Sequence, residues 1–328
     1  MPREKTRILL AGFGNVGRTL LYLLYSGRYK WASSIIVAGV CDSRGCAVKA
    51  DGFNGEEAAR LLDAPRGGLS ETPWGVKTSV EDLLGEVDVE IVVDARPSLY
   101  ESPHMDIYRL QGEKGYHIVT ANKAPLAIRP ELITENPLRE KIHYRATFMA
   151  GTPLFDLLVY GSAGRRILGI RGVFNTTTTY MLTLAEKGYS FEEALRKAVE
   201  AGVAEPDPSI DVECVDPAAK TAIIASTLGH ALRLGEVKRS GLRNSWSTGG
   251  FVRCVSSIRV EDNAVEAEVA PQAVGRDDPL RLAVGKNNVA VIEYGDGGRV
   301  VLSGSGGGPV ATSTIMISDI YKALRGLW

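Results

Sequence analysis

Three glycines near the amino terminus restrict the fold more than any other feature of the chain. They stand as Gly12-x-Gly14-x-x-Gly17, between an apolar segment typical of a buried strand and a helix-like segment, Arg18–Tyr25. Gly12 permits a tight turn, Gly14 lets the backbone approach a pyrophosphate, and Gly17 lets helix and strand pack closely. The pattern therefore predicts the first strand and helix of a parallel sheet that binds a dinucleotide. The predicted contacts at this turn are Gly12, Phe13, Gly14, Asn15, Val16 and Gly17.

The second apolar segment, Ile35–Cys41, ends at an acidic residue, Asp42. An acidic side chain at this place binds the adenosine ribose hydroxyls of NAD. Ser43 and Arg44 follow directly, and a hydroxyl beside a guanidinium suits the 2′-phosphate of NADP. We therefore predict that NAD or NADP binds through Asp42, Ser43 and Arg44, and the preference between the two cofactors stays open.

Two later strands end in segments that also suit a cofactor site. Val87–Asp94 and His117–Thr120 are apolar and strand-like. Ligands of an open parallel sheet bind beyond the carboxyl ends of its strands. Ordinary strand–helix turns and a surface lysine are the alternative explanations. The predicted contacts are Ala95, Arg96, Pro97, Ser98, Ala121, Asn122 and Lys123.

An acidic segment, residues 201–220, carries the second group of candidate residues. Its prolines oppose regular helix at first, whereas Pro217 suits the first turn of a helix that Asp216 is placed to cap. Asp216 and Lys220 are four residues apart and so share one helical face. A solvated loop whose ion pair supports a helix is the alternative explanation.

The order of elements predicts an α/β protein with two domains and a returning helix. Strand–helix alternation in residues 1–145 predicts a Rossmann-type dinucleotide-binding domain. Residues 146–308 predict an α+β domain for substrate binding, catalysis and dimerisation, with an open and mainly antiparallel sheet. Residues 309–328 predict a helix that returns to the first domain, and the glycines before it are expected to close over the nicotinamide.

The charge balance limits the partners. The chain has 38 basic and 39 acidic side chains and a net charge of −1, so it offers no basic field for nucleic acid. Its apolar runs are too short to span a membrane, and no secretion signal precedes the first strand. We expect a cytoplasmic protein, a homodimer, with a small-molecule substrate. Its four cysteines lack metal-ligand spacing and are expected to be free thiols.

With these motifs in order, the chain resembles homoserine dehydrogenase over nearly its full length. The motifs are AGFGNVG, the Asp42–Ser43 pair, TANK at Thr120–Lys123, the threonine run at Asn175–Tyr180, AEPDPSIDVECVDPAAK and the closing GSGGGPVATSTIMISDI. The acidic segment with its aspartate–lysine pair is the most specific of them.

The resemblance implies reversible conversion of L-aspartate 4-semialdehyde to L-homoserine with NAD or NADP, in threonine and methionine biosynthesis. It implies that Lys220 is the catalytic proton donor and that Lys123 lies near nicotinamide and substrate, so that the two amines converge on one carbon. Asp216 is implied in catalysis and in substrate binding. Further implied substrate ligands are Glu205, Asp211, Thr177 and Lys123, and further cofactor contacts are Gly202, Glu205, Gly306 and Gly308.

The sequence departs from the family pattern at three places. Thr176 and Thr179 replace a glycine and an asparagine in the threonine run. Arg145 stands where the family has a glutamate that helps to bind a monovalent cation, although the carbonyls of Phe148, Ala150 and Thr152 are candidate ligands. The short form without a regulatory domain is expected to escape inhibition by threonine.

Two other functions are consistent with these residues. One is an NAD(P)-dependent dehydrogenase of another small amino acid or semialdehyde, because the acidic segment suits any substrate with a cationic group. The other is a catalytically silent NADP-binding sensor, in which Arg44 holds the cofactor too tightly for turnover.

Overall fold

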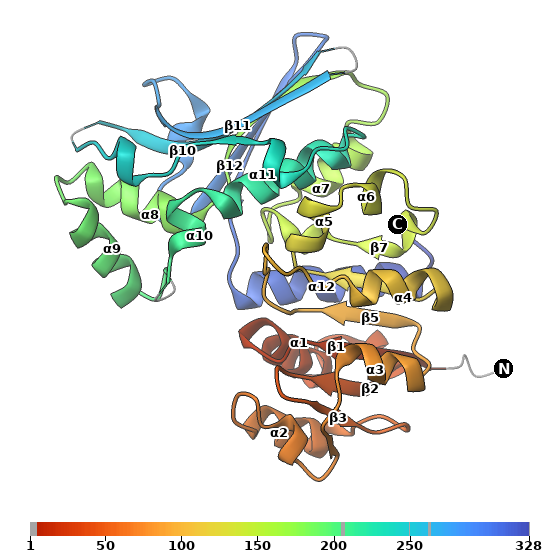
Figure 1. Cartoon of the computed structure of the whole chain (residues 1–328). Coiled ribbons are helices and arrows are strands. Elements are labelled where there is room, and N and C mark those ends of the chain that lie inside the picture. Colours follow the sequence, from red (N-terminus) through yellow and green to blue (C-terminus); the bar gives the residue numbers. More distant parts are fainter. Residues whose placement is uncertain (1–4, 205–206, 249, 262–263, 328) are drawn as a thin grey trace. The chain divides into compact units, whose positions relative to one another are not determined.

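The computed structural model describes residues 5–204, 207–248, 250–261 and 264–327 (Figure 1). The chain divides into two compact units. The first consists of residues 1–125, 135–147 and 308–328, and the second of residues 126–134 and 148–307. Residues 126–134 were predicted in the first domain. They fall in the second unit because helix α6 (Glu131–Thr134) packs against α11 (Val215–Thr227) and Glu131 pairs with Arg233.

The first unit contains a seven-stranded sheet in the order β4-β3-β2-β1-β5-β6-β7. Strands β2, β1, β5, β6 and β7 are parallel to one another, whereas the short β3 pairs antiparallel with both β2 and β4. The strands are β1 (Thr6–Ala11), β2 (Ile35–Cys41), β3 (Cys46–Val48), β4 (Gly75–Val76), β5 (Ile91–Asp94), β6 (His117–Thr120) and β7 (Ile142–His143). The helices are α1 (Asn15–Tyr25), α2 (Gly55–Asp63), α3 (Val80–Glu86), α4 (Asp106–Lys114) and α12 (Pro309–Leu324).

The core of the first unit lies under α1 and α12, which pack side by side against the sheet (Figure 1). Leucines of α1 and Met316, Ile317 and Ile320 of α12 bury their side chains among the valines and isoleucines of the central strands. Burial of this apolar surface is the main stabilising term for such a layer. Ser313 of α12 also donates a hydrogen bond of 2.9 Å to the carbonyl of Val16. The closing helix therefore fixes the start of α1, where the glycine turn lies.

Parallel pairing brings four predicted segments to one edge of this sheet. Ala11 pairs with Cys41 and Asp94, and Asp94 pairs with Thr120, so four strands end level with one another. The glycine turn and the segments after Cys41, Asp94 and Thr120 consequently share the carboxyl edge. This arrangement confirms the predicted Rossmann-type class.

The prediction of four free thiols is wrong. Cys41 and Cys46 form a disulfide, with Cα atoms 4.0 Å apart. The reason is the short hairpin of β2 and β3, in which these two residues are direct cross-strand partners. Cys214 and Cys254 are free and buried.

The second unit contains a six-stranded sheet in the order β13-β12-β8-β10-β11-β9. It is antiparallel except at the β11–β9 pair, which confirms the predicted open, mainly antiparallel sheet. The strands are β8 (Ile167–Val173), β9 (Lys238–Arg239), β10 (Val252–Glu261), β11 (Ala264–Ala273), β12 (Asn287–Tyr294) and β13 (Arg299–Ser305). The other helices are α7 (Leu154–Asp156), α8 (Thr176–Ala185), α9 (Phe191–Glu200) and α10 (Ser209–Val212), and α5 (Ala124–Ile128) joins the two units.

Helices α8 and α11 cover one face of the second sheet (Figure 1). Helix α11 is apolar almost all round, and its residues Ala218, Ala219, Ala222 and Ile223 are fully buried. A helix with this pattern belongs in a core. It therefore places Asp216, in its first turn, and Lys220, one turn later, on a rigid element.

Among the helices that the structure describes, none has both the length and the apolar character required to cross a bilayer.

Candidate active site

The glycine turn has the geometry that its spacing predicts. Gly12 has φ +100°, and a Cβ atom there would lie 2.5 Å from the carbonyl carbon of Ala95. A Cβ on Gly17 would lie 2.0 Å from the Gly12 oxygen, so only glycine lets α1 pack on this turn. Gly14 faces open space and is the N-cap of α1, without a side-chain cap. The first N–H groups of α1 are thus suited to an anion such as pyrophosphate.

Two of the residues predicted to contact the cofactor at this turn have side chains that contact other parts of the protein. Phe13 is buried in the core, where the Arg18 guanidinium lies 4.5 Å from its ring centre. The side-chain oxygen of Asn15 accepts a hydrogen bond of 2.7 Å from Arg66. Val16 is partly buried. A cofactor at this turn therefore meets mainly backbone.

Asp42 organises the loop after β2. One of its carboxylate oxygens accepts the N–H of Arg44 at 2.8 Å, and the other accepts the N–H of Leu69 at 3.0 Å. Ser43 and Arg44 are exposed. The side chain of Arg44 lies against Gly67, where a Cβ would come within 2.9 Å of it. Asp42 thus holds Arg44 beside the segment after α2.

That segment supplies a residue that was not predicted, Arg66. Arg18 of α1 donates to the carbonyls of Leu62 and Ala64, at 2.6 and 2.7 Å, and so anchors the segment over the glycine turn. Burial, followed by the positive charge of Arg66, lowers the pKa of Arg18. Arg18, Arg44 and Arg66 therefore make this edge of the first unit electropositive, as a phosphate group requires. Nothing in the local sequence around Arg66 indicated this role, because Arg66 reaches the turn from a distant loop.

At the next strand end, Arg96 points inward. Its guanidinium pairs with Asp94 at 2.9 Å and with Asp106 at 2.8 Å, and only 9% of its side chain is exposed. Burial works against its charge, but the two carboxylates outweigh it and raise the pKa of Arg96. Its contribution to a cofactor site is therefore through its backbone, while Ala95, Pro97 and Ser98 are partly or fully exposed.

Lys123 follows β6 and is partly buried. Its backbone N–H donates to the hydroxyl of Ser98 at 2.9 Å, which links the two predicted cofactor segments. Asn122 is fully buried and its amide donates to Asp94 at 3.2 Å, so it serves the scaffold and not a ligand. Ala121 lies partly buried beside them.

The second unit holds a cluster of charges around Lys220. The Lys220 ammonium lies 2.7 Å from the Asp216 carboxylate and 2.7 Å from the carbonyl oxygen of Phe174. The side-chain amide of Asn175 donates to Asp216 at 2.8 Å and to Asp211 at 2.6 Å. Two carboxylates, one amide and one ammonium therefore share a largely buried site.

The start of α11 differs from the prediction. Cys214, with φ +57°, is the N-cap, and Asp216 lies within the first turn instead of capping it. The left-handed residue turns the chain sharply from the acidic segment into the helix. Asp216 and Lys220 consequently stand on one face, as their spacing predicts.

The threonine run forms the first turn of α8, which begins at Thr176. Asn175 caps this helix by accepting the N–H of Thr178 at 2.8 Å, and the hydroxyls of Thr178 and Thr179 bond back to the Asn175 carbonyl. The hydroxyl of Thr177 donates to the Val203 carbonyl at 3.1 Å. Capping by asparagine outweighs the β-propensity of threonine here.

Two carboxylates close together make the cluster sensitive to protons. Burial, and next the negative charge of Asp216, raise the pKa of Asp211, although side-chain hydrogen bonding with Asn175 and Thr177 and the positive charge of Lys220 act in the opposite direction. A cationic group placed beside Asp211 would relieve this repulsion. The cluster can therefore attract an ammonium and donate a proton from Lys220.

The remaining predicted residues are spread over both units. Glu205 lies outside the described residues. Gly202, with φ +62°, follows α9. A Cβ on Gly306 would collide with the Asn288 amide at 2.3 Å, and Gly308 is the N-cap of α12 with φ +106°.

The residues do not fit the monovalent-cation site that the resemblance implies. Arg145 is itself a fixed cation, and it donates to Asp319 and to Ser318, each at 2.5 Å. The carbonyl of Thr152 accepts the N–H of Leu154 at 2.8 Å, while Phe148 and Ala150 are buried. Among the described residues, no group of three or more His, Cys, Asp or Glu side chains is arranged to hold a metal.

Comparison with known proteins gives a consistent result. The family model described as homoserine dehydrogenase matches residues 153–321. A homoserine dehydrogenase of Methanocaldococcus jannaschii is 33% identical over 331 residues, covering 95% of this chain and 97% of that protein. An NAD(+)-dependent homoserine dehydrogenase of Pseudomonas canavaninivorans is 28% identical, covering 96% of this chain and 95% of that protein.

The fold agrees with the sequence comparison. A hyperthermophilic archaeal homoserine dehydrogenase mutant, solved in complex with NADPH, is similar with a TM-score of 0.84 and 29% identity. The match covers 99% of each chain. The glycine turn, the Lys220 cluster and these likenesses together show that the chain belongs to the homoserine dehydrogenase family.

Proposed function

We propose that the protein interconverts L-aspartate 4-semialdehyde and L-homoserine with NAD or NADP. The observation that carries this proposal is the buried cluster of Lys220, Asp216, Asn175 and Asp211. The cluster offers an ammonium group that can contact the reacting oxygen of the substrate. It also offers carboxylates that can bind the substrate's amino group.

Lys220 is the proton donor of the reductive direction. Negative charge grows on the aldehyde oxygen as the carbonyl is reduced, and an ammonium beside that oxygen stabilises the charge and gives up a proton. Asp216 and the Phe174 carbonyl each take one N–H of Lys220 and so fix its direction. Among the described residues this leaves the third N–H for the substrate oxygen. Bound nicotinamide supplies or accepts the hydride.

Asp211 and Asp216 bind the substrate's α-ammonium in this proposal. The pKa of Asp211 is raised by burial and by Asp216, so a second positive charge is favourable beside this pair. Thr177, which belongs to α8, lies beside Asp211. It is proposed to contact the substrate, together with Glu205 and Lys123. Asp211→Asn is expected to raise the KM for homoserine about tenfold or more while leaving nucleotide affinity within about twofold.

The cofactor lies on the electropositive edge of the first unit. Gly12, Gly14 and Gly17 accommodate the pyrophosphate, and Asp42 with Ser43 and Arg44 binds the adenosine ribose. One relative is named an NAD(+)-dependent homoserine dehydrogenase, and another was solved in complex with NADPH. These two relatives support NAD or NADP as the cofactor. Gly202, Gly306 and Gly308 remain proposed contacts.

The two alternative functions are separated by one set of assays. NADH and NADPH oxidation are followed with aspartate semialdehyde and, separately, with oxaloacetate plus ammonia. The proposal predicts turnover with the semialdehyde alone. A preference for oxaloacetate indicates another dehydrogenase, and tight nucleotide binding without turnover of either substrate indicates a silent sensor.

We infer that two copies pair through the second sheet. A hollow on this sheet is lined by both signs of charge, with Arg166, Arg171, Lys238 and Arg259 near Glu266, Glu268 and Glu293. Such a face can complement itself across a two-fold axis. Analytical ultracentrifugation should give twice the chain mass of 35.3 kDa. Arg259→Glu should shift the protein toward monomer, whereas Arg276→Glu, at an exposed site outside this hollow, should not; a monomeric parent protein contradicts the inference.

A further inference from the structure

We infer that Asp94 is a positioning residue that joins the Ala95–Ser98 segment to the segment carrying Lys123. Asp94 itself is fully buried and does not reach a ligand. The inference deepens the proposed function, because it concerns how the nucleotide-binding edge fixes a residue that is expected to contact nicotinamide and substrate.

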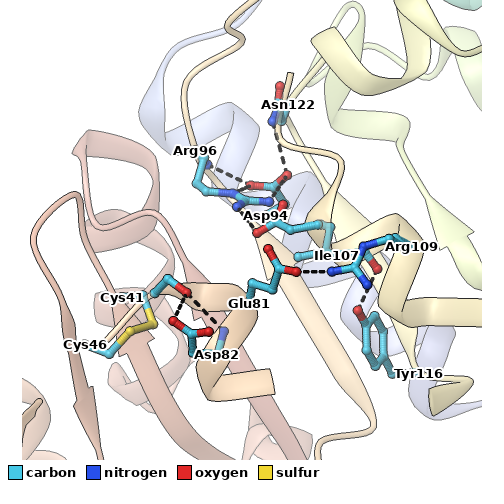
Figure 2. A network of polar contacts seen from close by, with 12 residues as sticks. Cys41, Cys46, Glu81, Asp82, Asp94, Arg96, Ile107, Arg109, Tyr116 and Asn122 are labelled. Atoms are coloured by element: carbon cyan, nitrogen blue, oxygen red, sulfur yellow. Dashed lines mark hydrogen bonds and ion pairs between the residues drawn. A yellow bond between two sulfur atoms is a disulfide. The ribbon is translucent and has the colours of Figure 1, made fainter. Parts of the chain in front are cut away.

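The first link runs from Asp94 to the segment that follows it. One Asp94 oxygen accepts the backbone N–H of Arg96 at 3.1 Å and the Arg96 Nε at 2.9 Å (Figure 2). Both the backbone and the side chain of Arg96 are therefore bound to one carboxylate. The backbone of Ala95 and Arg96 is in turn packed so closely against Gly12 that a Cβ there would lie 2.5 Å from Ala95. Asp94 consequently sets the segment against the glycine turn.

The second link runs from Asp94 to the loop after β6. The other Asp94 oxygen accepts the Asn122 amide at 3.2 Å, and Figure 2 shows Asn122 and Arg96 reaching this carboxylate from different loops. Asn122 also accepts the N–H of Ala124 at 3.2 Å, while its own N–H donates to Thr120 at 2.9 Å. The residues on both sides of Lys123 are thus fixed through one buried amide.

A third contact joins the two segments directly. The backbone N–H of Lys123 donates to the Ser98 hydroxyl at 2.9 Å. The nucleotide-binding segment and the Lys123 segment are therefore connected twice, once through Asp94 and Asn122 and once through Ser98. Misplacement of a positioned group by about 1 Å can cost roughly a hundredfold in rate.

The carboxylate is required for its charge as well as its shape. It balances the buried Arg96 guanidinium, and Asp94→Asn would turn one acceptor into an N–H donor that faces another donor, with almost no change in volume. Asp106 is the other acid at Arg96, at 2.8 Å, but no contact of the described residues joins it to Asn122. Asp106→Asn therefore perturbs the same arginine without breaking the link to Lys123.

These contacts define a test with matched variants. Asp94→Asn and Asn122→Ala should each lower kcat at least tenfold at saturating substrates. The double variant should lose little more than either single one, because both act through the same link. Asp106→Asn, and Glu81→Gln in the exposed Glu81–Arg109 ion pair of Figure 2, should keep kcat within about threefold.

A second readout does not depend on turnover. Acylation of Lys123 by an amine-reactive reagent, measured by mass spectrometry, should be slowed at least fivefold by saturating nucleotide in the parent protein and in Glu81→Gln. In Asn122→Ala the protection should fall below twofold. If Asp94→Asn does not fold, the kcat and the Lys123 protection of Asn122→Ala test the inference alone.

The inference is overturned if Asn122→Ala keeps parental kcat and protection, or if Asp106→Asn lowers kcat as much as Asp94→Asn. It is also overturned if the losses in the double variant are additive. A parent protein that binds nucleotide and protects Lys123 but turns over no homoserine contradicts the proposed function alone, and the protection assay then decides the inference.

Discussion

The ammonium of Lys220 lies 2.7 Å from the carboxylate of Asp216, one helical turn away on α11. Only 11% and 12% of the two side chains are exposed, so solvent screens the pair weakly. The pair stands on one face of a buried helix, and the ammonium also donates a hydrogen bond of 2.7 Å to the carbonyl oxygen of Phe174. This rigid placement gives Lys220 a defined direction before substrate arrives.

Removal of that ammonium should abolish most of the activity. Lys220→Ala is expected to lower kcat roughly a hundredfold or more, because transition-state charge on the substrate oxygen loses its partner. Steady-state kinetics with each nucleotide give the measurement. Lys187→Ala, at an exposed lysine of the same unit, is the control and should be near parental. Near-parental kcat in Lys220→Ala removes Lys220 from the reaction.

The charge of Asp211 should make the protein less stable at high pH. Burial and Asp216 raise its folded-state pKa above its ordinary value, so ionisation is harder in the folded protein than in the unfolded chain. Stability is then greatest below the ordinary pKa of about 4 and falls as pH rises through the folded-state pKa. Asp211→Asn removes this fall. Its Tm should exceed the parental Tm at pH 8 and match it near pH 4; an equal shift at both pH values contradicts the assignment.

A histidine pair should make the first unit sensitive to acid. His117 and His143 are stacked, with ring nitrogens 3.0 Å apart. Burial, followed by the charges of His117, Lys322 and Arg145, lowers the pKa of His143 to about 3. Because the folded-state pKa lies below the ordinary value, stability is complete above about pH 6.5 and is lost as pH falls toward 3.

Urea unfolding at two pH values measures this effect. The parent protein should lose on the order of 2 kcal/mol between pH 7 and pH 5 through His143. His143→Gln should show a correspondingly smaller loss over the same interval. The same loss in both proteins assigns the acid sensitivity to other groups.

Arg44 should determine how well NADP binds relative to NAD. Arg44→Ala is expected to raise the Kd of NADP about tenfold or more and that of NAD less than threefold, because NADP alone has a 2′-phosphate. Arg66→Ala should have the same direction of effect. Arg60→Ala, at an exposed arginine of α2, is the control. Isothermal titration gives both constants, and equal losses for the two nucleotides contradict a role in phosphate binding.

Local patterns predicted much of the first unit and one close ion pair of the second. Strand, glycine turn and helix are set by residues adjacent in the chain, so Gly12, Gly14 and Gly17 could be assigned their roles from spacing alone. The i, i+4 spacing of Asp216 and Lys220 likewise predicts their contact. The Asp216–Lys220 contact is made within one helix, and the glycine turn joins a strand to the helix that follows it directly in the chain.

Features that depend on tertiary contacts were not predicted. Arg66 reaches Asn15 across 51 residues, and the inward direction of Arg96, in the loop after β5, depends on Asp106 of α4. The Cys41–Cys46 disulfide depends on the hairpin of β2 and β3. Strand β3 has only three residues, which is too short to give a periodic pattern in the sequence. The threonine run became helical because one cap at Asn175 outweighs the propensity of four residues.

The proposed activity is tested most directly by oxidation of L-homoserine, followed by nicotinamide absorbance, with NAD and with NADP in parallel. We expect reduction of at least one nucleotide that requires L-homoserine and is lost in Lys220→Ala. No homoserine-dependent reduction of either nucleotide by a folded, nucleotide-binding protein would contradict it.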